Sequence, residues 1–166
     1  MLLELIVPTI VLVSALVIDV RTHKIPNKLV LVAIVLCLLS SFYFYEFEGL
    51  KQGALAAGLA ILMTLPLVLI GALGAGDMKL MFAFGLATTY SAVFSVLVFS
   101  FFWAVFIGVA LAVANGQSKR MLNNIITIVL TRSSEGTQLQ RIPYTIPLFL
   151  GWVTFVVLGL RQGGLL

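Results

Sequence analysis

The chain alternates between long apolar runs and short polar segments. Most of the runs come close to the ~20 residues that an α-helix needs to cross the hydrocarbon core of a bilayer. The pattern predicts crossings over residues 5–18, 29–45, 53–73, 78–87, 92–114 and 142–160. We therefore expect an all-α integral membrane protein, a bundle of six transmembrane helices that forms a single domain over residues 1–166.

Local signals set three of these boundaries. The first run follows Glu4 instead of a basic region, and no small-residue cleavage pattern comes after it, so we expect a retained helix and not a signal peptide. The second run finishes in aromatic residues, which suit a membrane interface, at Tyr45. The uncharged stretch between Lys79 and Lys119 is about twice as long as one crossing, so we expect it to turn at residues 88–91.

Two further patterns concern helix contacts and helix ends. The third run carries small residues four positions apart, which predicts close approach of another helix. The pairs are Ala54 with Gly58 and Ala56 with Ala60. Before the second run, Pro26 is expected to end one element and Asn27 to cap the next helix.

Composition agrees with a membrane protein and excludes a soluble globular one. Hydrophobic residues make up 61% of the chain, charged residues make up 10%, and the mean hydropathy is +1.18, whereas soluble domains contain about a quarter charged residues. The single cysteine, Cys37, excludes an internal disulfide or a site with several cysteine ligands, and we expect it to be a buried small hydrophobe.

The basic residues predict the orientation in the membrane. With six crossings, one side collects eight of the ten Lys and Arg residues: Arg21, Lys24, Lys28, Lys79, Lys119, Arg120, Arg132 and Arg141. The other side has Lys51 and Arg161. Basic loops face the cytoplasm, which places both termini on the extracytoplasmic side and makes residues 115–141 a cytoplasmic loop. In a multi-pass protein this charge indicates topology, and we expect no nucleic-acid partner.

Within the cytoplasmic loop, apolar residues recur at roughly helical spacing between residues 121 and 129. We expect an amphipathic helix that lies in the membrane interface. A passive surface helix and a substrate-contacting helix are both compatible with this pattern.

Two aspartates lie at the cytoplasmic ends of predicted crossings. Asp19 ends the first run, and Asp77 comes just before the fourth. Carboxylates at membrane depth are costly and usually functional. Two carboxylates that lie close together share a proton at neutral pH, because adjacent like charges cannot both ionise cheaply. One can then activate a water as general base while the other, protonated, polarises a peptide carbonyl.

The residues around Asp77 suit this chemistry. Gly74 and Gly76 weaken the helix and permit backbone geometries through which water and an extended substrate can reach Asp77. The alternative is a simple helix start, at which the helix N-terminus stabilises Asp77. Lys79 and Arg21 either pair with the carboxylates or serve as topological positive charge. His23 is expected to be a solvated loop residue, and no metal site is predicted.

The order of these motifs resembles the type IV prepilin peptidases, which are intramembrane aspartyl proteases of the Gly-x-Gly-Asp type. The resemblance rests on Asp19 followed by Ile25-Pro26-Asn27, on Gly74-Ala75-Gly76-Asp77, and on Ile142-Pro143-Tyr144 with Gly151. It implies that Asp19 and Asp77 are the catalytic pair. The other motif residues, Ile25, Pro26, Asn27, Gly74, Gly76, Lys79, Pro143 and Tyr144, would support them.

The resemblance also implies a substrate and a location. Family members cut the leader from a prepilin or pseudopilin at the cytoplasmic face of the inner membrane, and they use no cofactor. Larger bacterial members carry a cytoplasmic insert with paired cysteines and methylate the new N-terminus. This chain has no such insert next to Asp19 and only one cysteine, so it resembles the compact members that serve tight-adherence (Flp) pili. We expect protease activity without N-methyltransferase activity.

The sequence is also compatible with two alternative functions. The archaeal preflagellin peptidases share the two-aspartate pattern. A proton- or cation-coupled transporter also uses intramembrane acids, although here both acids lie near one face and the chain shows no obvious inverted repeat of its helices.

Overall fold

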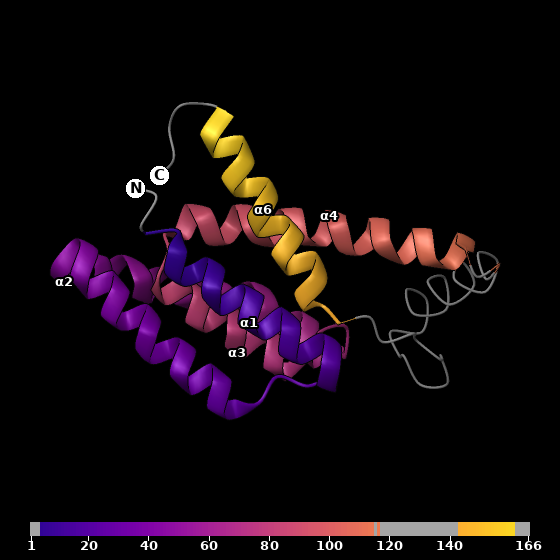
Figure 1. Cartoon of the computed structure of the whole chain (residues 1–166), viewed down its shortest axis with the longest axis horizontal. Coiled ribbons are helices and arrows are strands. Elements are labelled where there is room, and N and C mark those ends of the chain that lie inside the picture. Colours follow the sequence, from indigo (N-terminus) through magenta and orange to yellow (C-terminus); the bar gives the residue numbers. More distant parts are fainter. Residues whose placement is uncertain (1–3, 115, 117–142, 162–166) are drawn as a thin grey trace.

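The computed structural model describes residues 4–114, 116 and 143–161 (Figure 1). These residues form helices and no strands. The helices are α1 (Ile6–Thr22), α2 (Asn27–Leu69), α3 (Ala75–Leu86), α4 (Tyr90–Ala114) and α6 (Thr145–Arg161). The expected interfacial helix at residues 121–129, and all of the expected cytoplasmic loop except Gly116, lie outside the described residues. The all-α class is thus confirmed for the part of the chain that the structure describes.

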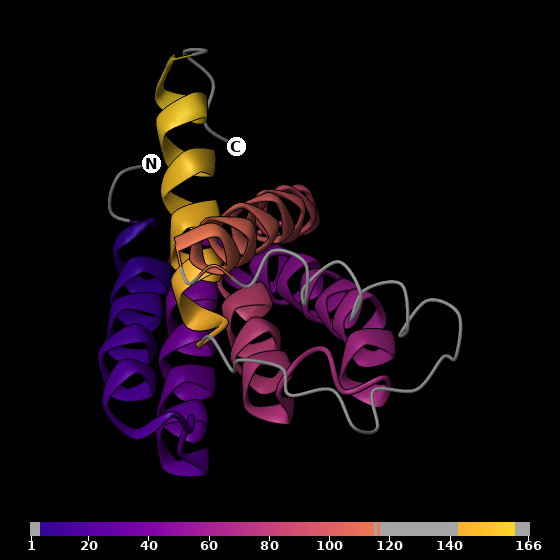
Figure 2. The ribbon, with the colours of Figure 1, turned by 90° about the vertical axis from the view of Figure 1, so that its right-hand side faces the viewer.

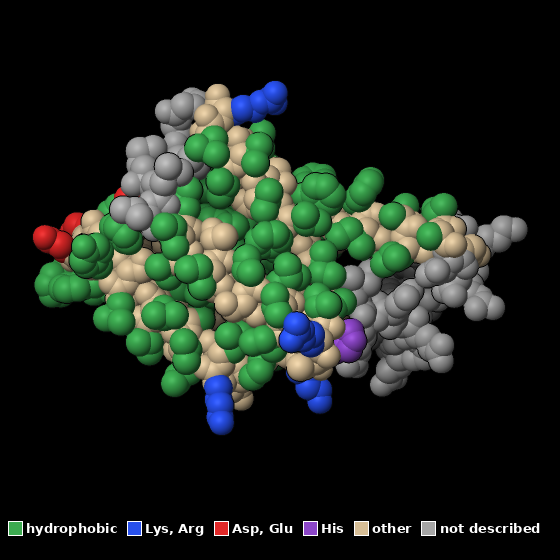
Figure 3. Space-filling model, in the orientation of Figure 1, with side chains coloured by type: hydrophobic (Ala, Val, Ile, Leu, Met, Phe, Trp, Pro, Cys, Tyr) green, Lys and Arg blue, Asp and Glu red, His purple; other side chains and the backbone are tan. Residues whose placement is uncertain are grey.

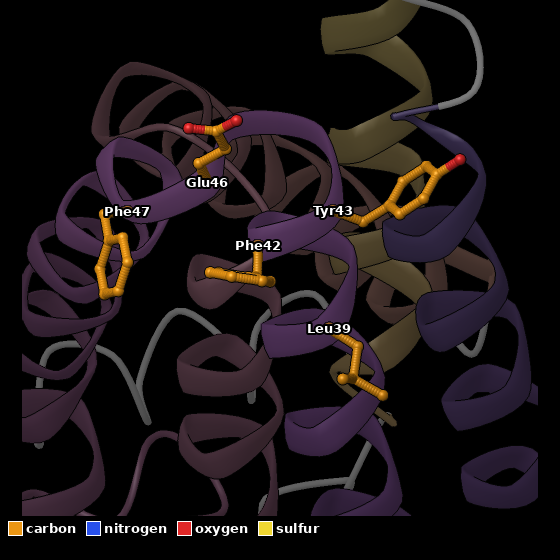
Figure 4. Close-up of a pocket in the computed structure, with 5 residues that line it drawn as sticks. All are labelled: Leu39, Phe42, Tyr43, Glu46 and Phe47. Atoms are coloured by element: carbon orange, nitrogen blue, oxygen red, sulfur yellow. The ribbon is translucent and has the colours of Figure 1, made fainter.

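The element α2 consists of two helical arms that meet at Glu46. The backbone of Glu46 has φ 53° and ψ −138°, which is not helical, and the chain turns back on itself there (Figure 4). A Cβ atom on Gly49 would lie 2.6 Å from the carbonyl oxygen of Ser41, so only glycine fits where the arms separate. The first arm ends at Tyr45, as the aromatic residues at the end of the second run predicted.

Helix boundaries follow the apolar runs at the other connections as well. Between α3 and α4 the chain turns at residues 87–89, within two residues of the predicted position. Between α1 and α2 it turns at His23, whose left-handed backbone (φ 51°) ends α1. Pro26, with its extended backbone, is the residue that precedes α2, and Asn27 is already helical. The prediction that Asn27 caps this helix is therefore wrong.

The short helix α3 lies at the centre of the fold, between the two arms of α2 (Figure 2). Its side chains at Leu80, Met81 and Phe84 are completely buried. The second arm of α2 packs against it so closely that backbones touch: a Cβ on Gly85 would lie 2.7 Å from the backbone of Ala57. This contact fixes α3, and with it the segment that begins at Gly74.

Only one of the two predicted small-residue pairs takes part in this packing. Ala56 and Ala60 are completely buried, as expected for a helix contact. Ala54 and Gly58 are exposed, and a Cβ on Gly58 would meet nothing within 4 Å. The prediction of a helix contact at Ala54 and Gly58 is therefore wrong, because these two residues face away from α3. Cys37 is a buried free thiol, as predicted.

The last described helix, α6, crosses α4 and also contacts α1 (Figure 1). Its contact with α4 depends on Gly151, where a Cβ would lie 2.7 Å from the carbonyl oxygen of Val96. Trp152 then packs edge-on against Phe84 of α3, with 5.2 Å between ring centroids. The core thus joins α6 to α3 although more than fifty residues separate the two helices in the sequence.

The surface is apolar over most of the molecule. Hydrophobic side chains cover the face seen in Figure 3, with basic groups where α1 ends and α2 begins and acidic groups near the bend of α2. Among the described helices, α2 and α4 are long and apolar enough to cross a membrane, and α6 is a shorter apolar helix. Exposed apolar area on this scale fits a lipid environment, since soluble monomers rarely expose large contiguous apolar patches.

Candidate active site

Asp19 lies in the last turn of α1 and faces the interior. Its relative exposure is 6%, although basic or exposed residues surround it in the sequence. Its Oδ2 atom accepts a hydrogen bond from Thr145 Oγ1 at 2.8 Å. Thr145 begins α6 and is 2% exposed, so the bond is shielded from solvent. A buried carboxylate requires such a partner, because burial without hydrogen bonds is costly.

Asp77 lies in the first turn of α3. Gly74 precedes this helix with an extended backbone, and the Asp77 side chain turns back towards it and interacts with its backbone N–H. An acid at this position satisfies one of the donors that a helix start leaves free. The other oxygen, Oδ1, is buried and has no hydrogen-bond partner among the described residues.

The carboxylates of Asp19 and Asp77 are close enough to interact electrostatically. They come from different helices, α1 and α3, and fifty-seven positions separate them in the sequence. The structure thus brings together the two acids that the sequence analysis selected. The helix-start alternative describes only part of the environment of Asp77, because that alternative leaves its second oxygen without a partner. A buried, unpartnered acceptor beside a second carboxylate is suited to bind water or a substrate group.

The first turn of α6 completes the site. Next to Thr145, Tyr144 lies near Asp77, and its hydroxyl oxygen is 2.6 Å from Ser100 Oγ of α4. Ser100 donates its own proton to the carbonyl oxygen of Leu97. In this arrangement the Tyr144 hydroxyl donates to Ser100, so it anchors α6 to α4. Pro143 immediately precedes this turn.

The predicted Ile25-Pro26-Asn27 segment lies beside the glycines of α3. A Cβ on Gly76 would lie 3.1 Å from the Ile25 Cβ atom, so the two segments are in close contact. Asn27 Oδ1 accepts a hydrogen bond from Lys79 Nζ at 3.0 Å. Of the two roles considered for Lys79, pairing with a carboxylate is not observed among the described residues. Instead it joins the start of α2 to α3.

Sequence reasoning missed two residues of this site, Thr145 and Ser100. Thr145 directly follows the Pro143-Tyr144 motif, and a hydroxyl residue at the start of an apolar run resembles an ordinary helix-start residue. Ser100 lies within a long apolar helix, where its hydroxyl bonds to the backbone of the same helix. Neither residue carries a sequence signal that indicates its partner.

Two hollows in the described structure lie away from the aspartates. One, of about 660 Å³, lies at the bend of α2 and is lined by Leu39, Phe42 and Phe47, among others (Figure 4). The other, of about 350 Å³, lies between the start of α1, the α2 bend and the α3–α4 turn. No group of three or more potential metal ligands occurs in the described residues. In this part of the chain, the carboxylate pair is therefore the candidate for the catalytic groups.

The fold and the site together define an α-helical membrane protein with a pair of interacting carboxylates from two helices, of which Asp19 is buried and Asp77 is partly buried. A family model described as the type IV leader peptidase family matches residues 6–113, and the chain belongs to this family of peptidases. The predicted family membership is thus confirmed, and the match includes both aspartates. Neither the curated proteins nor the solved structures contain a match.

Proposed function

We propose that this chain is an intramembrane aspartyl endopeptidase in which Asp19 and Asp77 are the catalytic pair. The observation that carries the proposal is the electrostatic interaction between these carboxylates, together with the buried Asp77 Oδ1 atom, which has no partner among the described residues. A peptidase of this family needs a group that activates water. Paired carboxylates supply it without a metal, since they hold one proton between them.

The proposed reaction follows from this single shared proton. The ionised carboxylate takes a proton from a water molecule, whose oxygen attacks the carbonyl carbon of the scissile peptide bond. The protonated carboxyl donates a hydrogen bond to the carbonyl oxygen and stabilises the charge that develops there. When the C–N bond breaks, the leaving amine takes up the proton that the first carboxylate received from the water.

The proposed substrate is an N-terminal leader of a type IV prepilin or pseudopilin, of the Flp class, cut at the cytoplasmic face of the inner membrane. Membership of the leader peptidase family supports this substrate class. The proposed topology has six crossings, with both termini on the extracytoplasmic side. It is supported by the basic residues that follow Asp19 and Asp77, because basic residues concentrate in cytoplasmic loops.

The chain should act without N-methyltransferase activity. In the test, the purified wild-type chain receives a cleavable prepilin together with S-adenosylmethionine carrying a labelled methyl group. We expect the shortened pilin to appear without label. Labelled product would show that cleavage and methylation occur together in this compact chain.

Cleavage itself is tested by co-expression of the chain with a candidate Flp prepilin and detection of leader removal by gel shift. Asp19→Asn and Asp77→Asn keep the size of each side chain and remove its acidity, so we expect both to abolish cleavage while the proteins remain in the membrane fraction. A chelator should leave the wild-type rate unchanged. If either variant cleaves at the wild-type rate, the carboxylate-pair mechanism is wrong. An archaeal preflagellin in parallel distinguishes the two substrate classes.

A further inference from the structure

Two hydrogen bonds join α1 to α6, and they differ in the group that accepts the bond on α1. Near the start of α1, Trp152 Nε1 donates to Thr9 Oγ1 at 2.9 Å. Near its end, Thr145 Oγ1 donates to Asp19 Oδ2 at 2.8 Å. Each bond uses one threonine hydroxyl, but only the second ends on a proposed catalytic carboxylate. The chain therefore provides a pair of similar contacts in which one can serve as the control for the other.

The Thr145 hydroxyl is held on a rigid support. The turn before it is anchored to α4 by the 2.6 Å contact between Tyr144 and Ser100. One to two helical turns further along α6, the backbone at Gly151 lies directly against α4. Because Thr145 is fixed from both sides and 2% exposed, its hydroxyl has a defined direction and little competition from water.

A donor fixed in this way determines how the Asp19 carboxylate is turned. A free carboxylate at the end of α1 can rotate about its side-chain bonds, and rotation changes which oxygen faces Asp77. Catalytic groups need positions accurate to a fraction of an ångström, and supporting hydrogen bonds provide this accuracy. The bond from Thr145 restrains one oxygen of Asp19 and so limits the directions open to the other.

We propose that Thr145 is a positioning residue that holds the Asp19 carboxylate in the orientation needed to share a proton and a water molecule with Asp77. The inference rests on the proposed aspartyl peptidase function and adds a third helix to its site. It also assigns a role to α6, which lies beyond the residues matched by the family model. Thr145 acts through Asp19 and does not itself react.

The test compares three variants in a leader-cleavage assay with the purified full-length chain and a prepilin. Thr145→Val keeps the shape of the side chain and removes the donor. A hydrogen bond to a charged group corresponds to roughly a 10- to 100-fold effect, so we expect kcat to fall by about that factor with KM within about twofold. Thr145→Ser keeps the hydroxyl and should restore most of kcat. Thr9→Val removes the other α1–α6 bond and should leave kcat within about twofold.

These variants separate positioning from simple helix attachment. If the Thr145 bond only joined α1 to α6, Thr145→Val and Thr9→Val would lower the melting temperature to a similar degree. The kcat values of the two variants would then also be similar. Equal kcat for Thr145→Val and the wild type, or failure of Thr145→Ser to restore activity, overturns the inference. Asp19→Asn in the same assay keeps the two proposals distinct. If Asp19→Asn cleaves normally, the proposed function fails and the inference fails with it. If Asp19→Asn is inactive and Thr145→Val is fully active, only the inference fails.

A second measurement requires no substrate. The melting temperatures of Thr145→Val, Asp19→Ala and the double variant form a double-mutant cycle. If the hydrogen bond exists, the double variant loses less than the sum of the two single losses. Additive losses would show that the two residues do not interact, which overturns the inference.

Discussion

Carboxylates lie at both ends of α1, in different surroundings. Where α1 ends, Asp19 is buried, bonded to α6 and close to Asp77 of α3. At the opposite end, the acids of the α2 bend are exposed, and Glu48 pairs with Lys51 of the same helical arm at 2.7 Å, both side chains being more than two thirds exposed. The same functional group is thus a candidate catalyst at one end and a solvated charge at the other.

The difference comes from how closely other helices surround the acids at each end. Around Asp19, the end of α1 meets the starts of α3 and α6, and each brings a polar group. At the α2 bend, a single element turns back on itself, and Glu46 and Glu48 are exposed (Figure 4). Convergence of several helix ends is what removes water from a carboxylate and gives it a specific partner.

The largest expected effect comes from exchanging acids for amides at the two ends. Asp77→Asn should lower the leader-cleavage rate by at least ~10³-fold, because it removes an acid that takes part in proton transfer. Glu48→Gln at the α2 bend should stay within about twofold of the wild type, since an exposed ion pair contributes about 0–1 kcal/mol. Initial rates at matched protein levels in membranes test this. A comparable loss in Glu48→Gln would show that the two ends are functionally coupled.

Glycine substitutions at the two ends should separate activity from stability. A Cβ on Gly76 meets only the Ile25 side chain, at 3.1 Å, so Gly76→Ala should lower the cleavage rate by roughly 10-fold through a small displacement, with little change in melting temperature. A Cβ on Gly49 meets the backbone oxygen of Ser41 at 2.6 Å, so Gly49→Ala should cost about 1–3 kcal/mol of stability.

Gly58→Ala serves as the control for both glycine variants, because the added methyl group meets open space. It should be neutral or slightly stabilising, since alanine favours helix over glycine by about 1 kcal/mol. Thermal melting in detergent, together with the rate per folded molecule, distinguishes the three outcomes. If Gly76→Ala reduced stability as much as Gly49→Ala, the contact with Ile25 would be structural and not specific to the site.

A smaller effect is expected from the two aromatic residues that anchor α6. Tyr144→Phe removes the bond to Ser100 beside the aspartates, and Trp152→Phe removes the bond to Thr9. Tyr144→Phe should cost about 1 kcal/mol of stability, and Trp152→Phe should cost more, because it also leaves a cavity beside Phe84. Only Tyr144→Phe should also slow cleavage, by several-fold, because it loosens the turn that carries Thr145. Equal activity of the two variants would show that this turn is held by packing alone.

The smallest expected effect is on the stability of the protein at low pH. It comes from a hydrogen bond near the start of α1, where the exposed acids lie. Tyr45 donates a hydrogen bond to Glu4, which holds the pKa of Glu4 below its ordinary value. A lowered pKa in the folded state contributes stability above the unfolded pKa of ~4.3, and this contribution is lost as the pH falls through the folded value. Tyr45→Phe should therefore lower the melting temperature slightly at neutral pH, and this difference should disappear as the pH falls through the folded pKa of Glu4. A difference that grows in acid would contradict this assignment.

Much of the fold followed from the apolar runs. The runs predicted the described helices closely, including the break after Tyr45 and the turn between α3 and α4, because backbone groups in an apolar setting must be satisfied within helices. The Ala54–Gly58 contact and the Asn27 cap were wrong. Spacing along a helix does not tell which face meets another helix, and a side chain that suits a cap can instead bind a residue distant in sequence, as Asn27 binds Lys79.

The candidate site likewise contains residues that could be predicted from the sequence and residues that could not. Asp19 and Asp77 could be selected from the sequence, because a charge bordering an apolar run is rare and costly. Thr145 and Ser100 could not, since a hydroxyl residue is compatible with many positions in an apolar helix and shows its role only when its partner is known. The glycines of α3 were expected to open access to Asp77, and the structure adds that Gly76 also admits Ile25.

The sequence by itself determined where the helices lie, that the protein suits a membrane, and which two acids are candidates for the catalytic pair. These features depend on local hydropathy and charge. Only the tertiary structure decided that the two acids interact, that Asp77 keeps an oxygen without a partner among the described residues, and that α6 supplies a hydroxyl to Asp19. The reason is physical: burial and hydrogen bonding of a carboxylate depend on helices that are distant in sequence, and their packing is set by close contacts such as those at Gly85 and Gly151.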